Sequence, residues 1–481
     1  MSAPPTNLQT AASSWPGQLW PERRSSPGAP FLVAALGVGL FAAAVLPDSS
    51  PGIATFLVLA ACEVVAGGAF ACSGRPRTAY QLGCGLLCLL LLAPLFLLDA
   101  LWVVALCVLA AAAVTVGALV DARTLTGIVA SAFAVPLATL RGLPWLGRGL
   151  SVARRFGAWG SVVRTLAISA GLLLVFGALF ASADALFSSW AGALVPDVSA
   201  EWFALRGFLL VAFTGLSLAG VYVASNPPVA DRLSPPQPSR HVRTFEWLVP
   251  VGVLDVMFAL FVAAQATAMF GGRGYVRRTT GLSYADYVHQ GFAQLTVVTA
   301  LTLLVVAGTS HVAEKASPRD RALLRVALGA LTALTLVVVA SALLRMHIYE
   351  EAFGFTRLRL LVSVFEGWLG IVVVLVMLAG FRLRGSWVPR TMLISGAVAL
   401  LALASVNPDA MIASHNLDRY RQTGRIDAGY LAELSSDAAP LLAGRWRGFD
   451  VCASGGEPSS GLSWNLSRAR AAHLRDAAGC G

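Results

Sequence analysis

The sequence predicts an all-α, polytopic transmembrane helical bundle of about 11 spans, and its composition and apolar runs carry this prediction. Of its 481 residues, 57% are hydrophobic and 12% are charged, which is about half the charged fraction of a typical soluble domain. The mean hydropathy is +0.72. Many apolar runs approach about 20 residues, the length that crosses a hydrocarbon core of about 30 Å. An ordinary soluble globule is therefore excluded.

The apolar runs form two membrane halves on either side of a proline-rich linker. The predicted spans are residues 30–46, 52–72, 80–98, 101–120, 162–183, 204–225, 245–270, 292–312, 322–344, 360–380 and 392–406. The predicted domains are a disordered cytoplasmic N-terminus (1–29), an N-terminal membrane half (30–225), a cytoplasmic linker (226–244), a C-terminal membrane half (245–406), an extracytoplasmic helical tail (407–446) and a disordered tail (447–481).

Residues 126–140 form an apolar stretch that is not predicted to cross the membrane. The stretch is short and contains Pro136, and the basic residues Arg148, Arg154 and Arg155 follow it. A crossing would place those arginines outside, against the positive-inside rule. We therefore predict a re-entrant or surface-lying segment, followed by a basic amphipathic helix over 141–161 on the cytoplasmic leaflet.

Charge distribution predicts a multi-pass membrane protein with its N-terminus inside and its C-terminal tail extracytoplasmic. The chain has 35 Lys and Arg residues and a net charge of +10. More than half of these residues fall in segments that this orientation places inside. Because they are dispersed among apolar runs, they form no separate basic module, and nucleic-acid binding is not predicted. The lipid bilayer is the predicted partner.

Three predicted external segments concentrate polar residues, and the first is 271–294. Ser283 and Asp286 have the spacing of a capping box before the span at 292–312. On a continuing helix, Asp286 and His289 would share one face. A capped, solvated helix entry and a functional cluster both remain open.

The second external segment, 345–359, has the most varied chemistry. It contains Arg345, His347, Glu350, Glu351 and Arg357. Arginines outside oppose the positive-inside preference, and we expect the two glutamates to compensate them. The alternatives are a structural ion-pair cluster and a substrate or ion site. A metal site at His347 and Glu351 is disfavoured because no second histidine motif supports it, and neither a metal nor a cofactor is predicted.

The third external segment begins at Asn407, which we predict to cap a helix with Pro408 at its first position. Gly424 is expected to end that helix, and Asp427 and Asp437 to cap two further short helices. This tail, over 407–442, would suit binding to an envelope or membrane protein partner. If the following segment lies outside, Cys452 and Cys480 are candidates for a disulfide.

Three acids lie within predicted spans: Glu63, Asp255 and Glu366. An ionisable group at such depth is a functional candidate because burying its charge is costly. Asp255 has no cation near it in the sequence. It would carry a proton, or bind a polar group such as Gln265 of the same helix.

The external motifs resemble a known family. They are Gly281-Leu-Ser-Tyr-Ala-Asp-Tyr-Val-His-Gln-Gly-Phe292, Arg345-Met-His-Ile-Tyr-Glu-Glu-Ala-Phe-Gly-Phe-Thr-Arg357, Asn407-Pro-Asp-Ala410 and Asn416-Leu-Asp-Arg-Tyr420. This string resembles a bacterial multi-spanning membrane protein family catalogued as domain of unknown function 4153/4173. The resemblance implies a bacterial cell-membrane protein and supplies no catalytic residue.

Three functional classes remain open. The favoured one is transport or sensing of a small solute or ion, using the polar external face and the buried acids. The second is a membrane enzyme acting on an envelope precursor, with Glu350, Glu351, Asp286 or His289 as acid or base. The third is a non-catalytic assembly or signalling partner. The sequence has no nucleotide-binding loop, and it specifies neither substrate, energy source nor oligomeric state.

Overall fold

The part of the chain that the structure describes is helical. The computed structural model describes residues 15–47, 49–152, 200–234, 242–270, 292–383, 385–453 and 461–480, with scattered positions between 165 and 189. These residues form α-helices and short 3₁₀ helices but no strands, with an isolated β-bridge between Val242 and Ala313. The predicted all-α class is confirmed.

In the described ranges, nine helices are long and apolar enough to cross a membrane, or ten if one bent pair forms a span. The nine are α4 (Ile53–Ala71), α5 (Ala79–Leu92) continued by α6 (Pro94–Leu97), α7 (Leu101–Val120), α12 (Ala200–Ser225), α13 (Thr244–Phe270), α16 (Phe292–Val312), α17 (Pro318–Phe353), α18 (Arg357–Arg382) and α19 (Val388–Ser405). The first predicted span corresponds to α3 (Ala29–Val45), a shorter apolar helix of 17 residues. Half of the predicted span at 162–183 lies outside the described residues. A multi-spanning membrane protein is confirmed, and the count of about 11 spans stays a prediction.

The chain divides into two compact units, which are described separately. Unit 1 comprises residues 1–234, 455–479 and 481, and unit 2 comprises 235–454 and Cys480. The boundary near residue 234 falls inside the predicted linker. The segment at 455–479 belongs to unit 1, although the sequence around it suggested a free tail.

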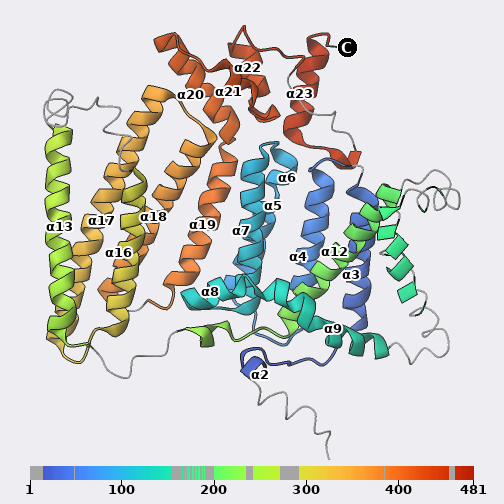
Figure 1. Cartoon of the computed structure of the whole chain (residues 1–481), viewed down its shortest axis with the longest axis horizontal. Coiled ribbons are helices and arrows are strands. Elements are labelled where there is room, and N and C mark those ends of the chain that lie inside the picture. Colours follow the sequence, from blue (N-terminus) through green and yellow to red (C-terminus); the bar gives the residue numbers. More distant parts are fainter. Residues whose placement is uncertain are drawn as a thin grey trace, which may run out of the picture. The chain divides into compact units, whose positions relative to one another are not determined.

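In unit 1, α3 and α4 pack against α12, and α5 packs against α7. The bent pair is α8 (Leu125–Ser131) and α9 (Ala134–Val152), with an angle of 58°. Both run across the direction of α4 and α7 (Figure 1). Pro136 lies in the first turn of α9, where its missing N–H costs no helical hydrogen bond. The re-entrant or surface-lying interpretation stays a prediction, and residues 153–161 of the basic segment lie outside the described residues.

The prediction of a disordered N-terminus is wrong for residues 15–29. Trp15–Leu19 forms the short helix α2. The Trp20 indole donates to the carbonyl of Asn226 (2.5 Å), whose side-chain oxygen accepts from the backbone N–H groups of Arg23 and Arg24 (2.7 Å each). Composition predicted disorder because it does not reveal such long-range partners.

In unit 2, α17 packs against α13, α16 and α18. It extends well beyond the predicted span at 322–344. Ser317 and Asp320 form a capping box at its start, and Gly354 ends it with a φ of 84°. The segment from Arg345 to Phe353, which contains most of the polar residues of 345–359, is therefore part of the same helix.

The predicted tail helices are present, and they gather beyond the adjoining ends of α17 and α18 (Figure 1). They are α20 (Pro408–Thr423), α21 (Ala428–Ala432) and α22 (Ala439–Arg445). Asn407 caps α20, Gly424 follows its end with a φ of 68°, and Asp427 caps α21, as predicted. Asp437 does not cap α22; it is buried in a 3₁₀ turn, where it accepts from the Ser435 hydroxyl (2.8 Å).

The prediction of disorder after Arg447 is wrong for residues 461–480. Leu466–Ala477 forms the helix α23, capped by Asn465. The Asn465 amide donates to the carbonyls of Leu95 (3.2 Å) and Leu98 (2.8 Å) in unit 1. Cys452 and Cys480 form a disulfide. Because of its Gly- and Ser-rich surroundings, this short helix was not predicted.

Candidate functional site

Arg357, at the start of α18, holds the tail through Asp409. Its guanidinium donates to both carboxylate oxygens, with Nε–Oδ1 at 3.0 Å and Nη2–Oδ2 at 2.5 Å. Asp409 is fully buried, whereas Arg357 is 34% exposed. The backbone N–H of Ser435 also donates to Asp409 (2.9 Å). Charge-assisted, bidentate hydrogen bonds of this kind are among the stronger polar contacts in proteins.

Asn416 and Tyr430 add two further ties at the same place. The Asn416 side chain accepts from the backbone N–H of Phe355 (2.8 Å) and donates to its carbonyl (2.9 Å). The Tyr430 hydroxyl accepts from the backbone N–H of Arg357 (2.7 Å), and burial raises the pKa of this phenol. A Cβ on Gly354 would lie 2.6 Å from the Asn416 oxygen, so glycine is needed there. We call Arg357, Asp409, Asn416 and Tyr430 the tail clasp.

The other charged residues of 345–359 make separate contacts. Glu350 is buried and accepts from the Ser363 hydroxyl (3.0 Å). His347 and Glu351 approach to 3.3 Å on the exposed face of α17. The expectation that the two glutamates compensate the arginines is wrong for Arg357, whose acidic partner is Asp409.

These contacts join the helices and the tail to one another. Asp286 and His289, predicted as members of the same external face, lie outside the described residues. The sequence reasoning missed Asp409, although it follows the Asn407-Pro408 helix start and its acidic side chain stood next to the predicted cap.

Two of the predicted intramembrane acids, Glu366 and Asp255, lie in unit 2. Glu366 of α18 is fully buried, and the Thr296 hydroxyl donates to one of its carboxyl oxygens (2.9 Å). Among the described residues, its other oxygen has no hydrogen-bond partner. For Asp255, the alternative of a bond to Gln265 is wrong: ten residues along a helix separate the two by about 15 Å, and neither the Asp255 Oδ1 nor the Gln265 side-chain nitrogen has a hydrogen-bond partner among the described residues.

Glu63, the third predicted acid, lines a groove in unit 1. The groove has a volume of about 230 Å³ between α4, α5 and α7. Gly67 and Gly85 lie along it, and a Cβ at either position would meet nothing within 4 Å. These glycines leave space beside the acid. The polar side chains that line the groove are Glu63, Gln81, Cys84, Cys88 and Thr115.

A short hydrogen-bonded chain reaches Glu63 from α5. The Thr115 hydroxyl of α7 donates to the Glu63 carboxyl (2.7 Å). Because that proton is engaged, the Thr115 oxygen is an acceptor for the Cys88 thiol, 3.2 Å away. The sequence singled out Glu63 but missed Thr115 and Cys88, since an apolar span carries no indication of which neighbour its face meets.

One end of this groove is held by polar contacts. The Gln81 side chain accepts from the backbone N–H of Thr78 (2.9 Å) and donates to Asp121 (3.3 Å), where α7 ends. Arg75 donates to the carbonyl of Leu119 (2.6 Å) and lies over the Phe70 ring at 4.8 Å. Glu63 lies farther along the groove, seven residues or about two α4 turns from Phe70.

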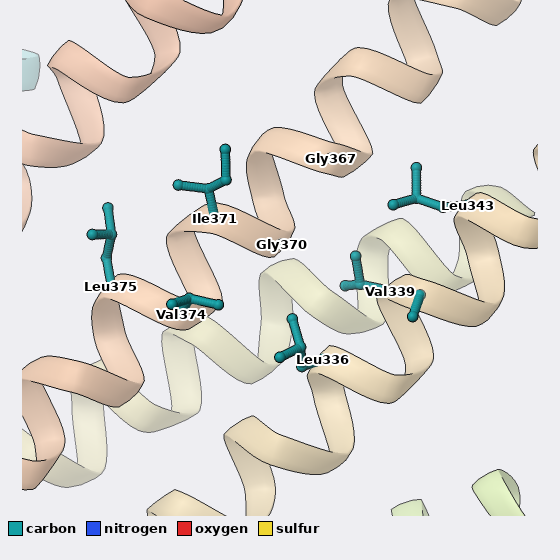
Figure 2. Close-up of a pocket in the computed structure, with 9 residues that line it drawn as sticks. Leu336, Val339, Leu343, Gly367, Gly370, Ile371, Val374 and Leu375 are labelled. Atoms are coloured by element: carbon teal, nitrogen blue, oxygen red, sulfur yellow. The ribbon is translucent and has the colours of Figure 1, made fainter.

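A second groove, in unit 2, has a different chemistry. It has a volume of about 360 Å³ and is lined by aliphatic and glycine residues of α17 and α18. Figure 2 shows Leu336, Val339 and Leu343 from one helix, and Ile371, Val374 and Leu375 from the other. Its lining has no polar side chain, so it offers only apolar contact. Within the described ranges, no cluster of three or more His, Cys, Asp or Glu side chains is placed to hold a metal ion.

The comparisons with known proteins agree with the motif string. The family model described as "Domain of unknown function (DUF4153)" matches residues 85–444, which is most of the chain. The protein belongs to this family. No curated protein and no solved structure matches the chain. The matched region includes the tail clasp and half of the residues that line the Glu63 groove, whereas Glu63 itself precedes it.

Proposed function

We propose that this integral membrane protein binds a small solute or ion within the membrane and transports or senses it, with Glu63 as the responsive group. The observation that supports this is the position of a carboxyl group in a groove of about 230 Å³. At membrane depth, such a group is stable when neutralised by a proton or by a positive partner. The groove has room for a partner to enter and leave.

Another intramembrane acid, Glu366, supports this role less well. Glu366 is fully enclosed and bonded to Thr296, which suits a structural group. Two members of the external polar face, Arg357 and Glu350, are engaged in joining α17, α18 and the tail. We propose that this face keeps the bundle in one arrangement, while Asp286 and His289 stay predicted members.

The test compares Glu63→Gln with Glu63→Asp and Glu351→Gln in cells that lack the chromosomal copy. We expect Glu63→Gln to lose rescue of the uptake, efflux or stress phenotypes of the deletion. Glu63→Asp keeps the charge and should retain part of the rescue. Glu351 is exposed and paired with His347, so Glu351→Gln should rescue in full. Full rescue by Glu63→Gln at equal membrane abundance would remove the proposal.

We also propose that the protein lies in the plasma membrane with the tail outside. The support is the Cys452–Cys480 disulfide, a bond that persists in oxidising compartments. Single cysteines at Ala352 and Ala428 should react with a membrane-impermeant maleimide in intact cells. A cysteine at Ala316, beyond the opposite end of α17 and next to its cap, should not. Labelling of the Ala316 position alone would invert the orientation.

A second candidate role is assembly or signalling through the tail. The supporting observation is the tail's own apolar core, which packs Leu417 of α20 against Leu431 and Leu442. A surface held in place by such a core and by the clasp is preformed for a protein partner. Replacing the exposed residues Tyr420 and Arg421 of α20 with Ala leaves the clasp and α23 in place and discriminates: an assembly role predicts loss of a co-purifying partner, and a transport role predicts retained activity.

A further inference from the structure

The residues that line the Glu63 groove include an acid and no base. The acid is Glu63, and none of the lining residues is Arg or Lys. The hydrogen bond to Glu63 comes from a neutral hydroxyl, that of Thr115. One neutral donor does not compensate an ionised carboxylate in a hydrocarbon surrounding, where the uncompensated charge costs several kcal/mol. An occupant that stabilises the ionised form must therefore carry positive charge.

The remaining walls restrict the occupant's shape. Val64, Leu89, Ala118 and the Phe70 ring line the groove together with the two glycines. Its volume of about 230 Å³ corresponds to roughly eight water molecules at their share of liquid volume. A hydrated ion would place its water shell against these apolar walls. A compact molecule with a hydrocarbon surface would fill the same space and make van der Waals contacts with the walls.

We propose that the Glu63 groove binds a compact organic cation, consisting of one ammonium group on an apolar body. The ammonium lies against the Glu63 carboxylate, and the apolar body contacts the Val64, Leu89 and Ala118 side chains. An organic anion of the same size is disfavoured because none of the lining residues is Arg or Lys to compensate its charge, and a neutral analogue gains the apolar contacts alone. This inference rests on the proposed function, because it names the class of solute that the same group recognises.

The test uses three probes that share one rigid hydrocarbon cage and differ in charge: one positive, one neutral and one negative. Full-length protein in lipid nanodiscs is titrated with 1-adamantylammonium, 1-adamantanol and 1-adamantanecarboxylate, and binding is measured by equilibrium dialysis. We expect the ammonium to bind about tenfold or more tighter than the alcohol, as is typical of a hydrogen bond to a charged group. The carboxylate should bind most weakly. Binding to empty nanodiscs is subtracted for each probe.

Three variants separate charge from space. Glu63→Gln removes the charge with little change of shape and should reduce the ammonium's affinity to that of the alcohol. Gly67→Leu keeps Glu63 and fills the groove, where a Cβ meets nothing within 4 Å, so all three probes should lose binding. Glu366→Gln is the matched control, because that glutamate also accepts from a threonine but lines no groove described above. It should bind like the wild type.

The inference is overturned if wild-type protein binds the three probes equally, or binds none of them at millimolar concentration. Ammonium binding that survives Glu63→Gln overturns it as well. These results differ from a failure of the proposed function, which is measured by rescue in cells. A protein whose rescue depends on Glu63 but that ignores the cation series would keep the function and lose this solute class.

Discussion

Two segments near the C-terminus are each held by a buried charge, and the sign of that charge is opposite in the two. In the tail clasp of unit 2, the acid Asp409 is fully buried and its partner Arg357 is 34% exposed. In unit 1, Arg468 of α23 is the buried member, with a side chain 6% exposed, and its partner Asp99 is 25% exposed. We call Arg468 with its partners the C-terminal anchor.

The two arrangements differ in how the buried charge is satisfied. The described hydrogen bonds to Asp409 come from Arg357 and from the backbone of Ser435. Arg468 instead donates to the Ser50 hydroxyl and to the Pro51 and Ser463 carbonyls, and its Nε lies 3.7 Å from Asp99. The clasp therefore depends on its charged partner, whereas the anchor is distributed over neutral oxygens.

The largest effect is expected from Arg357→Met, which removes both guanidinium hydrogen bonds from the buried Asp409 carboxylate. Breaking a buried pair in this way costs about 3 kcal/mol, at the lower end of the usual range because Arg357 is partly exposed. Hydrogen exchange in Pro408–Thr423, followed by mass spectrometry, should accelerate by about a hundredfold. The control Arg425→Met removes an exposed arginine of the same tail. Unchanged exchange in Arg357→Met would show that the clasp is dispensable.

Loss of the disulfide should have the next largest effect and tests whether the two segments are held independently. Cys452 and Cys480 are 28 residues apart, with α23 between them. Their bond limits the freedom of the unfolded segment, and we expect Cys452→Ser to cost about 2 kcal/mol. The faster exchange should appear in α23, while α20 keeps its protection. Cys72→Ser, at an exposed free cysteine, is the control. Equal loss in both helices would contradict independence.

The clasp and the anchor also show what sequence reasoning can reach. Caps such as Asn407 and Asp427 were predictable because the side chain and the N–H that it satisfies are close in sequence. Arg357 and Asp409 are 52 residues apart, so their pairing needed the fold. Around α23, Gly- and Ser-rich residues suggested disorder. The local indication was Asn465 followed by Leu466, Ala471 and Leu474 with interspersed arginines, which has the pattern of a capped amphipathic helix.

The same limit applies to the candidate site. Glu63 was predictable as a candidate because an acid in an apolar run is unusual. Its groove depends on Gly67, Gly85 and Thr115, which are ordinary residues of membrane helices and become informative only when their neighbours are known. Conversely, the conspicuous charges of 345–359 include Arg357, whose described bonds hold the tail.

A smaller effect is expected from Tyr430→Phe, which removes one hydrogen bond of the tail clasp. It removes the acceptor for the Arg357 N–H and should cost about 1 kcal/mol. Burial raises the pKa of Tyr430, so the folded tail favours the neutral phenol. This stabilisation is fully present below the ordinary tyrosine pKa of about 10 and is lost as the pH rises through the raised value. The difference in absorbance at 295 nm between wild type and variant should report one late-titrating phenol. A difference that titrates near the ordinary value would contradict the burial of Tyr430.

The smallest effect is expected from Asp99→Asn, and it provides the sharpest test of the comparison. Asp99 is the more exposed member of its pair, as Arg357 is in the clasp, so a rule based on exposure alone predicts similar costs. The buried Arg468, however, keeps the Ser50, Pro51 and Ser463 oxygens, and the lost attraction acts over 3.7 Å at a partly exposed group. We expect about 0.5 kcal/mol, as for surface pairs, and a two- to threefold faster exchange in α23.

Two control variants bracket this effect. Arg470→Met, at an exposed position of α23, should change exchange no more than Asp99→Asn does. Arg468→Met should change it by tenfold or more because it removes the donors of all three bonds. If Asp99→Asn instead matched Arg468→Met, the anchor would depend on a single charge pair, and its difference from the clasp would vanish.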